Sequence, residues 1–390
     1  MKILSIHNRY QIPGGEDVVV ESEKALLEAH GNSVDLLEAN NDQILGWMAI
    51  AKTSVEAIYS LQSQQLVEAK ISSLKPDVVH VHNFFPLLSP SIYDPCQEVG
   101  VAVVQTLHNY RLLCLNSYLF RDGQVCEDCL GKFIPWPGIV HRCYRDSYLG
   151  SGVVATMLTV HRIRHTWTEM VGYYIALTEF AKQKLIQGGL PSEKIVVKPN
   201  FVYPDPCIGE GRGNYALFVG RLSLEKGLNT LLLAWEKLWN KIPLKIVGDG
   251  SLADTVATAS RKVKTLEWLG RKSKQEVLAL MKDALILVFP SIWYEGFPMV
   301  ILEAYAVGLP VIASELGGMS SIIVSGSTGR FFQPGNAEDL VQQIEWVLEN
   351  PQELRKMRLK ARAEFEAKYT AQQNYHKLMD IYKLAIASKN

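Results

Sequence analysis

The stretch 285–313 constrains the fold of this chain more than any other part of its sequence. It starts with an apolar, partly β-branched run, residues 285–291, which has the length of a buried strand. A turn follows, Pro298 suits the first position of a helix, and residues 299–307 are apolar and compatible with a helix. Gly308 then ends this helix before a second apolar run. The stretch therefore predicts a strand–helix–strand unit, the building block of a parallel sheet.

The same alternation of strand-like and helix-like runs extends along the whole chain. In the first half, strands are expected at 2–6, 34–38, 76–82, 101–107, 173–178 and 195–197, and helices at 17–30 and 179–187. In the second half, strands are expected at 216–219, 244–247, 266–269, 285–289 and 311–313, and a helix at 228–238. A Pro- and Gly-rich stretch, 199–213, separates the two series. The pattern predicts an α/β protein with two doubly wound, Rossmann-like sheets.

Composition excludes several classes of protein. The chain has 390 residues, of which 48% are hydrophobic and 21% charged, as is usual for a globular protein with room for two domains. Its formal net charge of zero argues against a generic nucleic-acid binder. No run approaches the ~18 apolar residues of a membrane span, so no transmembrane segment is expected. Residues 1–6 begin a strand rather than a signal peptide, so we expect a cytoplasmic protein.

Two cations follow the first strand of the second series. Arg221 comes directly after Gly220 at the end of the expected strand, where ligands of open α/β sheets bind. Lys226 lies five residues further, at the expected start of a helix. Guanidinium and ammonium groups beside a helix N-terminus suit a diphosphate. The alternative is an ordinary pair of solvated surface cations.

Two glutamates flank the start of the expected helix 299–307. Glu295 lies in the turn, and Glu303 lies inside the helix among apolar residues. A carboxylate in such an apolar stretch is costly unless a partner meets it. The free N–H groups of the helix start and the two carboxylates suit a polyhydroxyl ligand. The alternative is a pair of surface glutamates on an ordinary helix.

Further candidates follow other strands. Gly248 and Gly270 close two strands of the second series, and Arg271 follows; glycine there lets the backbone approach a ligand. In the first series, Gly14 and Gly15 precede a helix and do not form the dinucleotide fingerprint, so a plain turn is the alternative.

The fourth expected strand of the first series ends at His108 and Asn109. His108 suits hydrogen bonding to a sugar hydroxyl or a part in proton transfer, and a purely structural histidine is the alternative.

The chain resembles the retaining family-4 glycosyltransferases, which have the GT-B fold of two Rossmann-like domains facing a cleft. The resemblance covers essentially the whole chain. The motifs that carry it are Val219-Gly220-Arg221 with Lys226-Gly227, Val247-Gly248-Asp249-Gly250, and Tyr294-Glu295-Gly296-Phe297-Pro298 with Glu303. It implies transfer of a hexose from a nucleotide sugar to a saccharide or lipid-linked acceptor, in polysaccharide or glycoconjugate biosynthesis.

The resemblance also implies domain limits. They are an acceptor-binding domain at 1–200, a nucleotide-sugar-binding domain at 214–370, and a helix at 371–390 that returns to the first domain. The apolar face of that helix would consist of Tyr375, Leu378, Ile381 and Tyr382.

The resemblance implies roles for individual residues as well. Arg221 and Lys226 would hold the diphosphate, Glu303 the ribose and Glu295 the sugar hydroxyls, while His108 would meet the transferred sugar. Such enzymes typically need no metal or other cofactor, because cations and helix dipoles neutralise the leaving diphosphate. The remaining substrate-binding set is Gly14, Gly15, Asn109, Gly220, Gly248, Gly270, Arg271, Gly296, Phe297, Pro298, Met299 and Val300.

The donor base and sugar are not marked by any residue of the sequence. UDP-glucose is favoured because it is frequent among similar proteins, with GDP-mannose and ADP-glucose as alternatives. A sugar-nucleotide epimerase of the same architecture is a rival, although no carboxylate pair in the first domain stands out for it. A non-catalytic carbohydrate-binding protein is a second rival, but it would have no use for a diphosphate clamp.

The segment 110–148 departs from the common pattern because it contains four cysteines, Cys114, Cys126, Cys129 and Cys143. A structural zinc site is one interpretation, but only one two-residue knuckle is present, so zinc is not favoured over free thiols or a disulfide.

Basic and aromatic residues accompany these cysteines. They suit an acceptor with an anionic headgroup and peripheral contact of the first domain with the inner face of a membrane, while a solvated insertion is the alternative. The residues are Trp136, His141, Arg142, Arg145 and Arg164.

Overall fold

The computed structural model describes residues 1–9, 14–40 and 56–389. Pro13, which precedes the glycine pair of the first expected loop, lies outside these residues. The chain divides into two compact units. The first unit comprises Met1–Leu119, Cys126–Asn200 and Asn374–Asn390, and the second comprises Phe120–Val125 and Phe201–Gln373.

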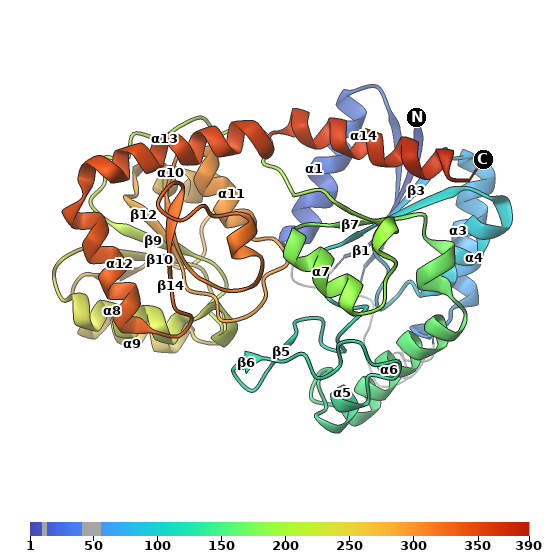
Figure 1. Cartoon of the computed structure of the whole chain (residues 1–390), viewed down its shortest axis with the longest axis horizontal. Coiled ribbons are helices and arrows are strands. Elements are labelled where there is room, and N and C mark those ends of the chain that lie inside the picture. The colour runs from blue at the N-terminus through green and yellow to red at the C-terminus, as the bar shows by residue number, and fades with distance from the viewer. Residues whose placement is uncertain (10–13, 41–55, 390) are drawn as a thin grey trace. The chain divides into compact units, whose positions relative to one another are not determined.

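The sheet of the first unit contains six parallel strands among the described residues, in the order β2-β1-β3-β4-β7-β8. Figure 1 labels β1, β3 and β7 of this sheet. The strands are β1 (Lys2–Arg9), β2 (Ser33–Asn40), β3 (Val78–Asn83), β4 (Ala102–Leu107), β7 (Tyr173–Ala176) and β8 (Ile195–Val197). β2 lies on one side of β1 in the sheet, and the chain then crosses to β3 on the other side of β1. The winding therefore reverses between β1 and β3, and the carboxyl ends of strands at such a reversal are where open α/β sheets bind ligands.

The helices of the first unit include the C-terminal helix. Its Leu378, Ile381 and Tyr382 pack with Ile3, Val104 and other buried residues of the sheet, so the expected apolar face is the packing face. Among the described residues, no helix combines the length and the apolar character needed to cross a bilayer. The helices are α1 (Gly15–Ala29), α3 (Leu61–Leu74), α4 (Tyr93–Val99), α5 (Trp136–Val140), α6 (Tyr148–Ile163), α7 (Glu179–Gln187) and α14 (Ala371–Ala387).

The sheet of the second unit has the order β11-β10-β9-β12-β13-β14 and is also parallel. Its strands are β9 (Ala216–Val219), β10 (Leu244–Val247), β11 (Leu266–Trp268), β12 (Ile286–Phe289), β13 (Val311–Ser314) and β14 (Gly329–Phe332). Its helices are α8 (Leu228–Leu238), α9 (Ala253–Lys262), α10 (Lys274–Asp283), α11 (Met299–Ala306), α12 (Ala337–Glu349) and α13 (Pro351–Lys368). A short hairpin, β5 (Phe120–Arg121) and β6 (Gln124–Val125), completes the unit.

Helices cover both faces of the second sheet. Leu217 and Leu287 point into a core shared with α10, α11 and α13, whereas Phe218 and Val288 point into a core shared with α8, α9 and α12. A parallel sheet buried on both faces needs apolar residues at every strand position, which explains the continuous apolar runs in the sequence. The expected class, two Rossmann-like α/β domains, is confirmed.

Several elements differ from the sequence expectations. Lys226 lies in a short 3-10 helix, Leu224–Lys226, that precedes α8 rather than at the start of α8 itself. The first helix starts at Gly15, two residues before the expected position, because the backbone N–H of Gly14 donates to Asp17 Oδ2 at 2.7 Å and caps it. The strand β14 and the helices α3, α6, α9 and α10 were not expected from the sequence.

Candidate active site

Three neighbouring strands of the second unit bring expected site residues to one edge of the sheet, and a fourth adds Ser291, which the sequence argument did not name. Gly270 follows β11, Gly248 follows β10, Gly220 follows β9 and Ser291 follows β12, and these strands are neighbours in the order β11-β10-β9-β12. All four are parallel, so their carboxyl ends lie side by side. The edge includes the point where the winding of this sheet reverses, between β9 and β12.

Gly248 shows how closely the backbone is packed at this edge. Its φ is +142°, and a Cβ atom at this position would lie 1.9 Å from the carbonyl oxygen of Gly220. Only glycine permits this approach of two strand ends. Gly270 also has a positive φ, +67°, and its carbonyl accepts a hydrogen bond from Gly248 N at 2.9 Å. Arg271, the next residue, is exposed.

The structure joins Lys226 to Glu295, which lies beyond β12. Lys226 Nζ donates to Glu295 Oε1 at 2.7 Å, and Ser291 Oγ donates to the same oxygen at 2.6 Å. Both partners of the ion pair are largely buried. Arg221 differs, since its side chain is 55% exposed and its closest carboxylate is that of Glu225, at 3.5 Å. Of the two cations expected to hold a diphosphate, Lys226 is therefore fixed by an ion pair and Arg221 extends into solvent.

The N-terminus of α11 offers donors at the same edge. Pro298 is the N-cap and has no side-chain hydrogen bond to the helix, so the first N–H groups, including those of Met299 and Val300, have no side-chain cap. Gly296 and Phe297 are partly exposed in the preceding turn.

Glu303 lies one turn inside α11 and is mostly buried. Burial raises the pKa of its carboxyl, and Lys274 offsets this only in part. No side chain among the described residues hydrogen-bonds to this carboxyl. The sequence suggested that this carboxylate needs a partner, and the described part of the chain does not supply one. A bound ligand with hydroxyl groups would satisfy it.

In the first unit, the expected residues lie around the ends of β1 and β4. Gly14 caps α1 and Gly15 begins it. His108 and Asn109 follow β4, and Asn109 Oδ1 accepts a hydrogen bond from Arg111 N at 3.0 Å. A small pocket beside His108 is lined by Asn109, Arg111 and neighbouring residues.

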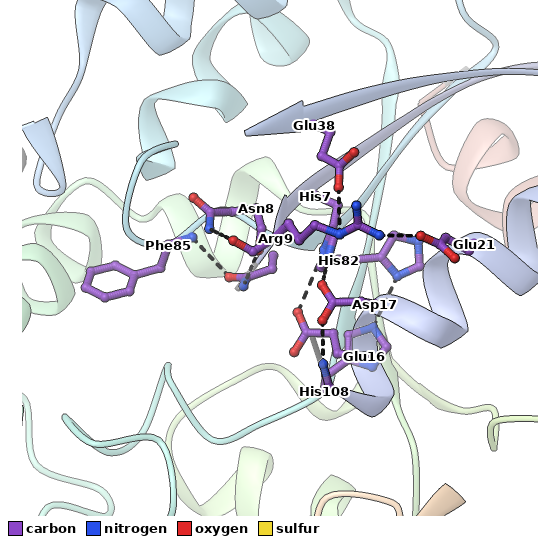
Figure 2. Close-up of polar contacts among 12 residues, drawn as sticks. His7, Asn8, Arg9, Glu16, Asp17, Glu21, Glu38, His82, Phe85 and His108 are labelled. Carbon is purple, nitrogen blue, oxygen red and sulfur yellow. Dashed lines mark hydrogen bonds and ion pairs between the residues drawn. The ribbon is translucent and has the colours of Figure 1, made fainter. Parts of the chain in front are cut away.

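The structure adds polar residues that the sequence argument missed. His7, at the end of β1, bonds through Nε2 to Asp17 Oδ1 at 2.8 Å, and Glu16 Oε1 lies 3.8 Å from His7 Nδ1 (Figure 2). Burial raises the pKa of Asp17, but hydrogen bonds from His7 and Gly14 outweigh it, so the net pKa lies below its usual value. Burial and the charge of Asp17 raise the pKa of Glu16 well above its usual value.

His82, near the end of β3, contacts His108. Its Nδ1 lies 3.1 Å from His108 Nε2 and the two rings stack (Figure 2). Burial, and then the nearby His7 and Lys198, lower the pKa of His108 to about 3. The sequence signal that could have revealed this cluster is the polar ending of β1 and β3, His7-Asn8 and His82-Asn83.

The four cysteines of the segment 110–148 form no disulfide. The ligand atoms of these cysteines are also not close enough together to hold a metal ion. Among the described residues, the side chains whose ligand atoms are that close are Glu23, His80 and His82. Arg164, expected at the acceptor, instead pairs with Asp94 at 2.9 Å.

The other expected acceptor residues stay at or near the surface. Trp136 is exposed, and the guanidinium of Arg142 lies over the ring of Tyr148 at 5.6 Å.

Comparison with known proteins gives a family match that lies within the second unit. Residues 209–364 match the family of glycosyl transferases group 1. An uncharacterized glycosyltransferase of Methanocaldococcus jannaschii is 33% identical over 198 residues, 50% of this chain and 55% of that protein. Glycogen synthase of Mycobacterium tuberculosis is 35% identical over 141 residues, 35% of this chain and 34% of the enzyme. The chain thus spans about half the length of these curated relatives, or less.

A solved structure extends the similarity of fold to both units. The Anabaena protein HepE, solved in complex with UDP and glucose, aligns with 97% of this chain and 98% of its own, with a TM-score of 0.66 and 16% sequence identity. At this identity the match shows the fold alone, which is of the GT-B type. Residues 209–364 of this chain thus match the glycosyl transferases group 1 family, within a chain whose two Rossmann-like units have the GT-B fold.

Proposed function

We propose that this protein is a retaining glycosyltransferase that moves a hexose from a nucleotide sugar to a saccharide or lipid-linked acceptor. The observation that carries the proposal is the edge of the second sheet. There, Lys226 is held by Glu295, and Arg221 extends into solvent from the same segment after β9. The uncapped start of α11 lies one turn from Glu303, to which no described side chain hydrogen-bonds. Cations and free N–H groups suit a diphosphate, and carboxylates suit hydroxyl groups.

The proposed donor is UDP-glucose. Glu303 would accept hydrogen bonds from the ribose, and Glu295, together with the amides of the α11 start, would hold the hexose. The backbone near Arg271 would contact the base. The similar fold of HepE, which was solved with UDP and glucose, supports this choice. GDP-mannose and ADP-glucose are the alternative donors.

The proposed mechanism is a front-face displacement. The bond from the anomeric carbon to the diphosphate breaks, and the acceptor oxygen bonds to that carbon from the same face. The departing phosphate oxygen takes the acceptor proton, and Arg221 and Lys226 stabilise the charge that develops on the leaving group. His108, whose pKa of about 3 keeps it neutral, would interact with the transferred sugar rather than act as a base.

The proposed acceptor site and location involve the first unit. Lys132 Nζ lies 5.8 Å from the centre of the exposed Trp136 ring, and Leu149 is 85% exposed. Exposed apolar side chains beside cations suit an anionic lipid surface. The protein would accordingly act in polysaccharide or glycoconjugate assembly at the inner face of a membrane.

A panel of nucleotide sugars tests the proposal. The protein should release free nucleoside diphosphate from one donor, faster when an acceptor is added. Conversion of the donor to an isomeric nucleotide sugar would instead show an epimerase, and binding without turnover would show a carbohydrate-binding protein.

The anomeric configuration of the product tests the mechanism. NMR coupling constants should show the same configuration in donor and product. Inversion would exclude both front-face displacement and a retaining enzyme.

A further inference from the structure

A line of buried polar side chains crosses the first unit and ends at His108. Lys198, which follows β8, donates from Nζ to Oε1 of Glu23 on α1 at 3.0 Å. The other carboxylate oxygen, Oε2, lies 3.7 Å from His82 Nε2 and has no hydrogen-bond partner among the described residues. His82 Nδ1 in turn lies 3.1 Å from His108 Nε2. The side chains of Lys198, Glu23 and His82 are at most 2% exposed, so bulk solvent does not reach them.

The order of donors and acceptors along this line determines where the protons lie. Burial lowers the pKa of His82 well below its usual value, and that of His108 to about 3, so both rings are neutral at pH 7. The nearest group to His82 Nε2 on the side of Glu23 is a carboxylate oxygen at 3.7 Å, beyond hydrogen-bond distance. Its negative charge attracts a proton on that ring nitrogen and repels a lone pair, so Nε2 carries the proton. His82 Nδ1 is then an acceptor, and His108 Nε2 must donate to it. This leaves His108 Nδ1 with a free lone pair, and no described residue hydrogen-bonds to it.

A metal ion is the competing interpretation of part of this cluster. Ligand atoms of Glu23, His80 and His82 lie within 4.8 Å of one another. However, the ammonium group of Lys198 already contacts the carboxylate, and a divalent cation beside it would be repelled. His80 also has both ring nitrogens engaged, one with the hydroxyl of Tyr382 and one with that of Thr106, each at 2.8 Å. The contacts therefore favour a polar relay over a metal site. In this relay, hydrogen bonds join Lys198 to Glu23 and His82 to His108, and the charge of Glu23 acts on His82 across 3.7 Å.

We propose that Glu23 and His82 are positioning residues that hold His108 as the Nε2–H tautomer, so that His108 Nδ1 accepts a hydrogen bond from a hydroxyl group of the transferred sugar. An acceptor leaves electron density on that hydroxyl oxygen, which stabilises positive charge developing at the sugar ring. A ring N–H at the same position would donate a hydrogen bond to the hydroxyl oxygen and so withdraw electron density from it. The effect on turnover rests on the proposed function, whereas the tautomer is a property of the first unit alone.

The unmodified protein provides the first test. With selective ¹⁵N labelling of its nine histidines, two-bond ¹⁵N–¹H correlations distinguish the nitrogen that carries the proton from the one that does not. The signals of His108 are identified by their loss in His108→Gln. We expect a protonated Nε2 and a bare Nδ1 at pH 7.5. A protonated Nδ1 would overturn the proposal.

Glu23→Gln provides a sharper test because it should reverse the whole line. Lys198 can only donate, so it should donate a hydrogen bond to the amide oxygen of the new side chain. The NH₂ group of the amide then faces His82 Nε2. That nitrogen must then accept, His82 Nδ1 becomes the donor, and His108 changes to the Nδ1–H tautomer. Glu28→Gln, on the exposed side of the same helix, is the matched control and should leave the spectrum of His108 unchanged. An unchanged His108 tautomer in folded Glu23→Gln would contradict the proposal.

A second variant covers the case in which Glu23→Gln does not fold. His82→Phe keeps an aromatic ring beside His108 and leaves the pair of Glu23 and Lys198 in place. Without the acceptor on His82, His108 should populate both tautomers. A single Nε2–H species in this variant would show that His82 does not fix the tautomer.

Kinetics connect the tautomer to the reaction. Glu23→Gln should lower kcat about tenfold or more while KM for the donor changes less than about threefold, since the affected contact matters most in the transition state. Equal loss in Glu28→Gln, or a purely KM effect, would contradict the positioning role. If the unmodified protein shows the expected tautomer but transfers no sugar, the proposed function fails and the relay stands.

Discussion

Lys226 and Glu295 form a largely buried ion pair across the edge of the second sheet, with 2.7 Å between Lys226 Nζ and Glu295 Oε1. The pair joins the turn before α8 to the turn before α11. Ser291 donates to the same carboxylate oxygen and fixes its position. A lysine held in this way loses less side-chain entropy when it binds a phosphate. The carboxylate thus orients the cation, and in the proposed function it also holds the hexose.

The first prediction concerns Glu295→Gln. The amide keeps a hydrogen-bond acceptor for Ser291 but loses the charge that holds Lys226, so the lysine should become mobile. We expect weaker binding of free UDP as well as lower turnover with UDP-glucose, measured by calorimetry and by a coupled assay. Unchanged UDP affinity would mean that Glu295 acts only on the sugar. Glu338→Gln, on α12, is the control because its ion pair with Lys237 is exposed.

The second prediction concerns the two cations themselves. Arg221→Ala and Lys226→Ala should each cost about 2–4 kcal/mol of transition-state stabilisation, because each removes a charge from the leaving diphosphate. Nucleotide affinity should fall while the melting temperature stays nearly constant for Arg221→Ala, whose side chain is exposed. Lys237→Ala is the control for a surface lysine of the same unit. Full nucleotide affinity in both clamp variants would show that the diphosphate binds elsewhere.

The third prediction separates stability from binding at Glu303. Its pKa is raised in the folded state, so the folded protein holds this proton more tightly than the unfolded chain, and this contribution to stability is lost as pH rises above about 4.5. Glu303→Gln should therefore raise the melting temperature at pH 7.5. It should also weaken UDP binding by about 1.5–3 kcal/mol, the value of hydrogen bonds to a charged group. A variant that binds UDP normally would exclude Glu303 from the nucleoside site.

The fourth prediction concerns His108→Ala. Because the proposed contact exists only with the sugar in place, turnover should fall by about 10²-fold while UDP affinity stays nearly unchanged. Steady-state kinetics and calorimetry on the same preparation provide both values. A parallel loss of UDP affinity would indicate that His108 supports the fold or the nucleotide instead.

The fifth prediction concerns acid stability. Burial lowers the pKa values of His80, His82 and His108, so the unfolded chain binds more protons than the folded one below pH 6.5. The free energy of unfolding should fall as pH drops from 6.5 toward 5, by about 1.4 kcal/mol per pH unit for each of these groups. Urea titrations at several pH values measure this slope. In His80→Gln, the slope of the free energy of unfolding against pH should decrease by the amount expected for about one proton. Replacement of the exposed His165 should leave this slope unchanged.

Much of the fold was readable in the sequence because its signals are local. The strands Ala216–Val219 and Leu244–Val247 and the helix Glu179–Gln187 have the expected limits, since short apolar runs bounded by glycine or polar turns identify them. The helices α9 and α10 were missed because their apolar positions are few and their surfaces are charged. Tertiary packing, rather than local pattern, stabilises such helices.

The sequence by itself determined which residues follow the strands, among them Arg221, Glu295 and His108, because residues after parallel strands necessarily gather at one edge of the sheet. Only the tertiary structure decided that Lys226 pairs with Glu295, 69 residues away, and that Lys198 pairs with Glu23, 175 residues away. Such pairs depend on the order in which the strands assemble and on the burial that follows. A polar residue such as Glu23, inside an ordinary amphipathic helix, carries no local sign of the partner that it will meet.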